Sequence, residues 1–181
     1  MKITGGQFKG TVLRVPSGRD LTRPTSDKVR QALFNILQGR AGESAFLDLY
    51  AGSGAVGLEA LSRGYPRSVM VEKHPAAFAC LEANCLLMEE RGAEKGSLEW
   101  KRLDVQDYCK KGLQSGWKFS VVFADPPFGD DFTGLWDRVS PLIAEDGIGI
   151  IQFPSRKPPV FTEKAARIYA YGESSLAVFL V

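Results

Sequence analysis

The chain has 181 residues, 44% of them hydrophobic and 24% charged, and its 23 basic and 21 acidic side chains give a formal net charge of +2. These values are typical of a soluble globular protein, and the length suits one domain that needs no disulfide or metal to hold its core. The longest apolar runs are strand-sized, well short of the roughly 20 residues that cross a bilayer. Since no apolar signal segment follows Met1, we expect a cytoplasmic protein without a membrane span.

Cysteine and histidine are scarce. Cys80, Cys85 and Cys109 are odd in number and form no C-x-x-C pair, which argues against a disulfide framework or a zinc site. His74 is the only histidine, so a histidine-based catalytic triad and a histidine-rich metal site are both excluded. We therefore expect no metal, and a chemistry that depends on carboxylates, backbone groups and a cofactor.

The positive charge is concentrated at the start of the chain. Residues 1–30 contain seven basic and two acidic side chains, for a net charge of +5, whereas residues 31–181 carry a net charge of −3. A basic arm on a nearly neutral body is typical of a protein that binds a polyanion. A solvated N-terminal hairpin is the alternative explanation.

In chain order, the first predicted elements form a small N-terminal unit. Residues 2–15 contain two short extended pieces separated by glycines. A helix is predicted from Thr25 or Ser26 to about Gln38, because either residue can cap a helix and apolar residues then recur at helical spacing.

Short apolar strands then alternate with helices. The predicted elements are strand 46–50, helix 55–63, strand 68–72, helix 75–91, strand 98–103, helix 105–113, strand 119–124, helix 132–144 and strand 147–153. This alternation predicts an α/β fold whose mostly parallel sheet has helices on both faces. Residues 167–171 and 175–181 flank Gly172 and are expected to close the sheet as an antiparallel hairpin.

A glycine-rich loop follows the first strand of this run. Gly52, Gly54 and Gly57 satisfy the pattern G-x-G-x-x-G between a strand and a helix, which lets the backbone approach a ligand at the carboxyl edge of the sheet. Glu72 ends the next strand and is placed to accept hydrogen bonds from both hydroxyls of a ribose. Together these features indicate a nucleoside-containing cofactor, either NAD or S-adenosylmethionine.

Two aspartates at strand ends bear on that choice. Asp48 precedes the glycine loop, where its charge would repel a pyrophosphate but attract the ammonium group of a methionine moiety. It therefore favours S-adenosylmethionine, with a structural cap for the loop as the alternative role. Asp104 ends the third strand and is expected to hold the adenine amino group or, alternatively, to cap the following helix.

The most specific motif is Asp125-Pro126-Pro127-Phe128 at the end of the fourth strand. Prolines fix φ and lack an N–H group, so the carbonyl groups around them face the site as rigid acceptors. The Asp125 carboxylate and the Pro126 carbonyl can each accept one N–H from an exocyclic amine and turn its lone pair toward an electrophilic methyl group. Phe128 can stack on the base that carries this amine. The alternative is a proline-rich strand exit with a core phenylalanine.

These motifs resemble those of the amino-methyltransferases that use S-adenosylmethionine. Residues 5–10 (GGQFKG), 23–30 (RPTSDKVR) and 33–37 (LFNIL) are similar, more narrowly, to the bacterial 16S ribosomal RNA guanine-N2 methyltransferases of the RsmD type. The resemblance covers nearly the whole chain. It implies a Rossmann-like, seven-stranded methyltransferase domain, residues 43–181, preceded by a small extension, residues 1–42, that contains the basic hairpin and the first helix.

The resemblance, together with the arguments above, assigns roles to individual residues. The cofactor would be bound by Thr25, Asp48, Tyr50, Ala51, Gly52, Ser53, Gly54, Gly57, Glu72, Lys73, Asp104 and Val105. The guanine would be received by the catalytic group Asp125, Pro126, Pro127 and Phe128. RNA phosphates are expected to be held by the basic residues Lys9, Arg14, Arg19, Arg23 and Arg30.

The chain departs from the family at two places. Many relatives have a glutamate near the end of the fifth strand, where this chain has Gln152. Some relatives have basic residues after the tetrapeptide, where this chain has Gly129, Asp130 and Asp131. We therefore do not expect that loop to bind RNA.

The predicted function is transfer of a methyl group from S-adenosylmethionine to the exocyclic N2 of a guanine in 16S ribosomal RNA, free or in a partly assembled small ribosomal subunit, by a monomer. An amino-methyltransferase acting on adenine N6 or on a protein glutamine amide is the nearest alternative. A dinucleotide-dependent oxidoreductase would leave Asp48 and the tetrapeptide unexplained, and a non-catalytic RNA-binding module would explain only the basic arm.

Overall fold

A computed structural model describes residues 1–16, 26–41, 45–127 and 132–181 of the chain. Its elements are α1 (Asp27–Ile36), β1 (Phe46–Leu49), α2 (Ala55–Ser62), β2 (Ser68–Glu72), α3 (Pro75–Glu90), β3 (Leu98–Arg102), α4 (Val105–Ser115), β4 (Phe119–Ala124), α5 (Leu135–Val139), η1 (Ser140–Leu142), β5 (Ile143–Pro154), η2 (Val160–Lys164), β6 (Arg167–Tyr171) and β7 (Ser174–Leu180). Within these residues, every helix is too short or too polar to span a membrane.

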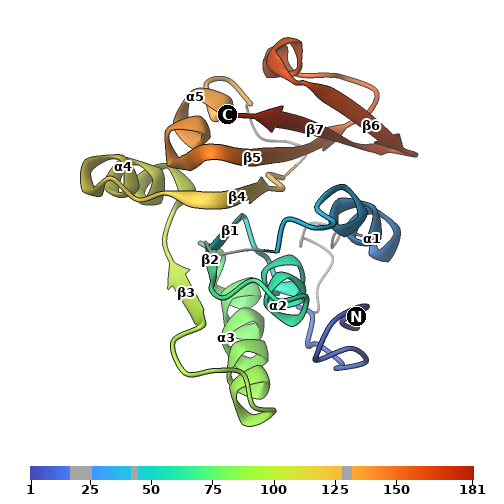
Figure 1. Cartoon of the computed structure of the whole chain (residues 1–181), viewed down its shortest axis with the longest axis vertical. Coiled ribbons are helices and arrows are strands. Elements are labelled where there is room, and N and C mark those ends of the chain that lie inside the picture. The colour runs from blue at the N-terminus through green and yellow to red at the C-terminus, as the bar shows by residue number, and fades with distance from the viewer. Residues whose placement is uncertain (17–25, 42–44, 128–131) are drawn as a thin grey trace.

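The seven strands form one sheet in the order β3-β2-β1-β4-β5-β7-β6 (Figure 1). Strands β1 to β5 pair in parallel, whereas β7 is antiparallel to both of its neighbours, β5 and β6. This arrangement confirms the predicted parallel sheet with a closing hairpin. The chain builds outward from β1 to β3 and then returns to place β4 beside β1, so the carboxyl ends of β1 and β4 flank the switch point where open α/β sheets bind ligands.

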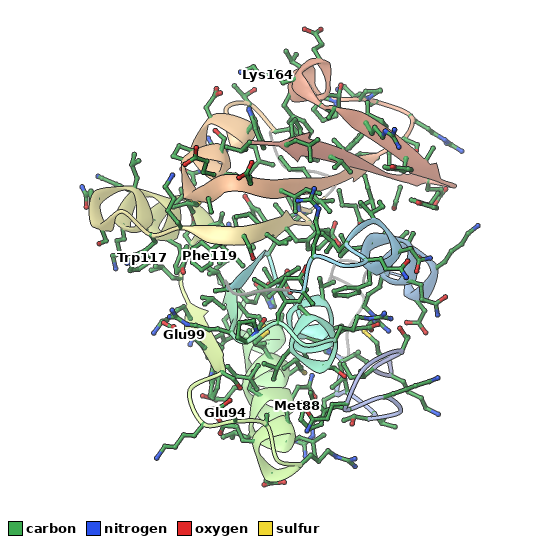
Figure 2. The ribbon with its side chains drawn as sticks, in the orientation of Figure 1. Met88, Glu94, Glu99, Trp117, Phe119 and Lys164 are labelled. Carbon is green, nitrogen blue, oxygen red and sulfur yellow. The ribbon has the colours of Figure 1, made fainter. Side chains whose placement is uncertain are left out.

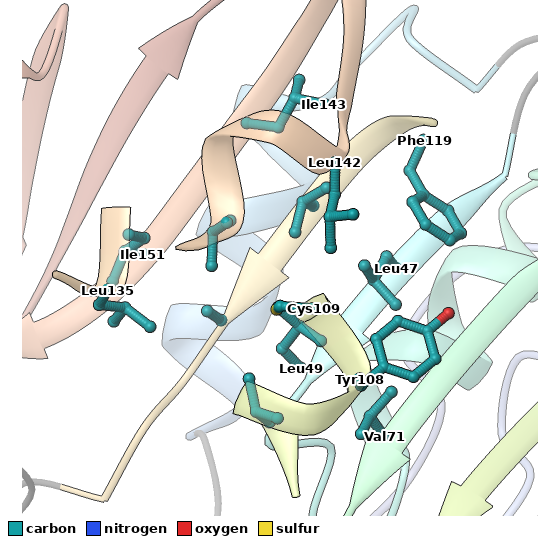
Figure 3. Packing of buried hydrophobic residues seen from close by; sticks show 14 of the residues in the cluster. Leu47, Leu49, Val71, Tyr108, Cys109, Phe119, Leu135, Leu142, Ile143 and Ile151 are labelled. Atoms are coloured by element: carbon teal, nitrogen blue, oxygen red, sulfur yellow. The ribbon is translucent and has the colours of Figure 1, made fainter. Parts of the chain in front are cut away.

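Helices cover both faces of the sheet, and side chains fill the space between the layers (Figure 2). Because alternate residues of a strand point to opposite faces, Leu47 and Leu49 of β1 lie in one core cluster with Tyr108 of α4 (Figure 3). Phe46 of the same strand lies in a second cluster with Leu33 of α1. The near-continuous apolar strands thus follow from burial on both sides.

The N-terminal segment packs onto α2 and α3. Where a hairpin was predicted, the described residues contain one antiparallel bridge, between Lys2 and Val12. Ile3, Phe8 and Leu13 are buried in a third core cluster to which α2 and α3 also contribute. The segment therefore shares a core with the body of the molecule.

The predicted helix over residues 132–144 is wrong in its extent. The chain forms only the short helix α5 and the 3-10 turn η1, and β5 begins at Ile143, before the predicted start at Gly147. Gly134 has a left-handed conformation with φ of 66° and delays the helix start. Pro141, which has no N–H to donate, lies in η1.

Candidate functional site

The loop between β1 and α2 turns through three residues with positive φ. Tyr50, Gly52 and Gly54 have φ angles of 63, 58 and 81°. Glycine adopts this conformation readily, whereas a tyrosine does so at a cost of about 1–3 kcal/mol. The glycines predicted the turn, but the left-handed tyrosine had no sequence signal. A Cβ on Gly52 would meet no described atom within 4 Å, so its backbone faces open space.

The other two glycines of the pattern let α2 lie close to its neighbours. A Cβ on Gly54 would overlap the side chain of Leu81 in α3. A Cβ on Gly57 would come within 2.5 Å of Cγ of Met70 in β2, far inside the carbon–carbon contact distance of about 3.5 Å. These two glycines therefore serve packing, and Gly52 is the one whose backbone a ligand can approach.

Asp48 contacts the start of α2, directly after this loop. Its side chain is 1% exposed and accepts a 2.9 Å hydrogen bond from the N–H of Gly57 in the first turn of α2. Burial raises its pKa to about 8, and the charges of Asp125 and Glu72 also raise it, against the lowering effect of the Gly57 hydrogen bond. The alternative role of Asp48, a structural cap for the loop, is therefore present, and its contact with a methionine ammonium stays a prediction.

Glu72, at the end of β2, also holds the loop. One carboxylate oxygen accepts a 2.8 Å hydrogen bond from the N–H of Gly52, and the other accepts a 2.7 Å bond from the N–H of His74. Each oxygen has a further lone pair, which suits the predicted contact with ribose hydroxyls. The carboxylate thus lies beside the glycine whose backbone is open.

Asn84 of α3 is a site residue that the sequence analysis missed. It is fully buried, and its Nδ2 donates to the carbonyl oxygens of Ser53 and Arg14, both at 2.9 Å. Its Oδ1 accepts a 2.8 Å bond from the N–H of Arg14. One side chain therefore joins the glycine loop to the basic N-terminal segment. In the sequence, Asn84 is a polar residue on the buried face of a helix, and no residue near it along the chain identifies its partners.

Lys73 and Asp104 meet beyond the ends of β2 and β3. The Lys73 ammonium lies 3.2 Å from the Asp104 carboxylate, and the N–H of Gln106 donates to that carboxylate, so Asp104 caps α4. Partial burial would raise the pKa of Asp104, but the hydrogen bonds from Gln106 and Lys73 outweigh it and lower the pKa. Val105 is buried in the core, so only its backbone could face an adenine.

The tetrapeptide begins where β4 ends, next to β1. The N–H of Asp125 donates a 3.3 Å hydrogen bond to the carbonyl of Leu49, which fixes the exit of β4 beside the start of the glycine loop. Asp125 and Pro127 are half-buried and Pro126 is buried. Asp125 is close enough to Asp48 to raise its pKa. Phe128, the last member of the predicted catalytic group, lies outside the described residues.

The predicted RNA-binding residues fall into three groups. Lys9 and Arg14 are exposed on the N-terminal segment, as the prediction requires. The assignment of Arg30 is wrong: its side chain is fully buried, with Nε 2.7 Å from Glu59 and a hydrogen bond to the Lys2 carbonyl. Arg19 and Arg23 lie outside the described part of the chain, as does Thr25, which was predicted to bind the cofactor.

Known proteins resemble this chain over most of its length. A family model described as "Conserved hypothetical protein 95" matches residues 1–179. The protein named ribosomal RNA small subunit methyltransferase D of Escherichia coli is 35% identical over 147 residues, which are 81% of this chain and 68% of that protein.

Solved structures share the fold. A hypothetical protein of Thermus thermophilus is 32% identical, with a TM-score of 0.85 over 100% of this chain and 99% of that one. A structure described as the SAM-dependent methyltransferase from Agrobacterium tumefaciens is 15% identical, with a TM-score of 0.61 over 76% of this chain and 47% of that one, and this likeness concerns the fold alone.

Proposed function

The chain belongs to the family described as conserved hypothetical protein 95, and we propose on this premise that it transfers a methyl group from S-adenosylmethionine to the exocyclic N2 of a guanine in small-subunit ribosomal RNA. The observation that carries the proposal is the juxtaposition of two sites. Asp125 and Pro126 lie at the end of β4, directly beside the glycine loop that follows β1. The name of the E. coli relative, a small-subunit ribosomal RNA methyltransferase, agrees with the RNA substrate.

The residues around the glycine loop fit S-adenosylmethionine. Gly52 presents an open backbone, and Glu72 beside it supplies carboxylate oxygens for ribose hydroxyls. The charges of Asp125 and Glu72 act on this region, where they raise the pKa of Asp48, and their negative potential suits a cationic ligand better than a pyrophosphate. When bound, this cofactor supplies an electrophilic methyl group on a sulfonium.

The tetrapeptide supplies acceptors for the substrate amine. The Asp125 carboxylate and the Pro126 carbonyl each accept one N–H, which holds the nitrogen lone pair toward the cofactor side. The nitrogen gains positive charge as it reacts, so these acceptors stabilise the transition state more than the ground state. Once the new bond forms, the acidified N–H releases its proton to Asp125 or water. Orientation of two bound reactants can contribute at best about 7–11 kcal/mol, so no strong base such as histidine is required.

The basic N-terminal extension is proposed to hold the RNA. We treat residues 1–42 as this extension and residues 43–181 as the methyltransferase domain. Lys9 and Arg14 point into solvent and are available for phosphates. We propose that a monomer acts on a partly assembled small subunit in the cytoplasm.

The proposal is tested by offering radiolabelled S-adenosylmethionine to the purified protein with several acceptors. These are free small-subunit RNA, small subunits, DNA and a protein extract, each prepared from cells that lack the enzyme. Label is expected in the small-subunit RNA, free or assembled, and mass spectrometry of its fragments locates the modified nucleotide. Label confined to DNA or to protein would contradict the proposal and favour another amino-methyltransferase.

A further inference from the structure

Gln152 of β5 carries a buried polar group that no described residue satisfies. Its side chain is 4% exposed, and its Nε2 makes one long hydrogen bond of 3.5 Å to Oγ of Ser174. Among the described residues its Oε1 has no hydrogen-bond partner. A buried acceptor without a hydrogen-bond donor costs free energy, and a donor on a bound ligand would remove that cost.

The sheet places this amide next to the tetrapeptide. Ala124 of β4 is in register with Ile151 of β5, so the next residues, Asp125 and Gln152, are neighbours across the two strands. Phe123 and Ile150, two residues earlier on each strand, share a core cluster on the face that also carries α1. Because side chains alternate, Asp125 and Gln152 are directed to this same face.

We propose that Gln152 is a specificity-determining residue whose Oε1 accepts the N1–H of the guanine that Asp125 and Pro126 hold by its N2 amine. The inference rests on the proposed function and extends it to base selection. On the Watson–Crick edge of guanine, N1–H and the N2 amine are adjacent donors. In adenine the ring nitrogen next to the amine is an acceptor, which would face Oε1 lone pair to lone pair. A site built to hydrogen-bond a donor rejects an analogue without it because its own buried group is left unpaired.

The test uses RNA in which 2-aminopurine replaces the target guanine, free or reconstituted into subunits. This base keeps the reactive 2-amino group but has no N1–H. The variants are Gln152→Met, which has similar length and no oxygen acceptor, and Gln152→Glu, which keeps an oxygen acceptor. Wild type is expected to prefer guanine by about tenfold or more in kcat/KM. Gln152→Met is expected to lose that preference through a slower reaction with guanine, whereas Gln152→Glu keeps it.

Ile150→Val provides the matched control, since it removes one methylene from the same face of the same strand. It is expected to lower stability and leave the preference unchanged. Cofactor affinity, measured by calorimetry, should be the same in all four proteins. If Gln152→Met does not fold, a lowered guanine preference in Gln152→Glu overturns the proposal.

The outcomes separate this inference from the proposed function. A Gln152→Met protein that prefers guanine as strongly as wild type, or that slows equally with both bases, overturns the role of Gln152 while methyl transfer to guanine stands. A wild-type protein that binds the cofactor but methylates no guanine overturns the proposed function itself, and the role of Gln152 with it.

Discussion

The two halves of the sheet's carboxyl edge differ in how their polar groups are satisfied. On the cofactor half, Asp48, Glu72 and Asn84 each accept or donate hydrogen bonds within the protein and hold the loop between β1 and α2. On the substrate half, two prolines offer no N–H, and the Oε1 of Gln152 has no partner among the described residues. The cofactor half is therefore held by hydrogen bonds within the protein before a ligand binds. The substrate half instead contains acceptors that a ligand can satisfy.

Asp125→Ala should separate the two halves most strongly. It removes the carboxylate that accepts the substrate amine and leaves the braces of the glycine loop intact. Transfer is expected to fall by about 1,000-fold or more, while cofactor affinity is retained. Single-turnover transfer and calorimetry measure the two effects, with Asp107→Ala in the exposed first turn of α4 as the control. Turnover at the wild-type rate would refute the role of Asp125.

Glu59→Ala should show how much the stability of the fold depends on the buried ion pairs between α2 and the N-terminal part of the chain. Glu59 of α2 is fully buried, pairs with Arg30 and Arg63 at 2.7 Å each, and accepts hydrogen bonds from Thr4. Its loss leaves the buried Arg30 guanidinium without its buried carboxylate partner and with only the exposed carboxylate of Asp27, so the free energy of unfolding is expected to fall by about 3–5 kcal/mol in urea denaturation.

The control for this variant is the exposed pair of Lys164 and Asp137, 3.2 Å apart, with Lys164 at the outer edge of the molecule (Figure 2). Asp137→Asn should change stability little, because exposed ion pairs are screened by water. Equal losses of stability in the two variants would show that the buried ion pairs of Glu59 stabilise the fold no more than an exposed ion pair does.

Asn84→Ala should loosen the loop without touching the substrate half. The change leaves the Ser53 carbonyl and the backbone of Arg14 without their side-chain partner. We expect cofactor affinity to fall by about tenfold, a loss of about 1.4 kcal/mol, with transfer at saturating cofactor nearly unchanged. Asn35→Ala on the exposed face of α1 is the control. A lower maximal rate of transfer at unchanged cofactor affinity would contradict the separation of the cofactor half from the substrate half.

Reversing Lys9 and Arg14 to glutamate should weaken RNA binding by up to about tenfold and flatten its salt dependence by about 1.5 in the logarithmic slope, since each lost phosphate contact contributes about 0.7–0.9. Binding titrations from about 50 to 200 mM salt measure the slope. Lys164→Glu, far from the N-terminal segment, should leave it unchanged (Figures 1 and 2). An unaltered salt dependence in the double variant would show that the N-terminal segment does not bind the RNA.

Asp48→Asn should change the pH dependence of stability. Burial raises the pKa of Asp48 from 3.8 to about 8, so the folded chain keeps a proton that the unfolded chain releases. The stabilisation is fully present below pH 3.8 and is lost as the pH rises through about 8. The asparagine variant should lack this loss in urea denaturation between about pH 5 and 9. Parallel pH profiles would show that Asp48 is already ionised in the folded chain.

Local signals in the sequence predicted much of the fold and part of the site. The cap at Ser26, which accepts a hydrogen bond from Val29, and the strands β2 and β4 agree with their patterns. The errors in the site came from long-range partners. Arg30 looked like a surface cation because its partner Glu59 lies 29 residues away, and Asn84 had no local reason to reach the glycine loop.

The central claim is that the tetrapeptide presents the N2 amine of a guanine to the cofactor. The most direct measurement is mass spectrometry of nucleosides from small-subunit RNA that has reacted with trideuteromethyl-labelled S-adenosylmethionine, compared with synthetic standards. The predicted product is guanosine that carries the labelled methyl group on N2. Label on adenosine N6, or on another position of guanosine, would contradict the claim.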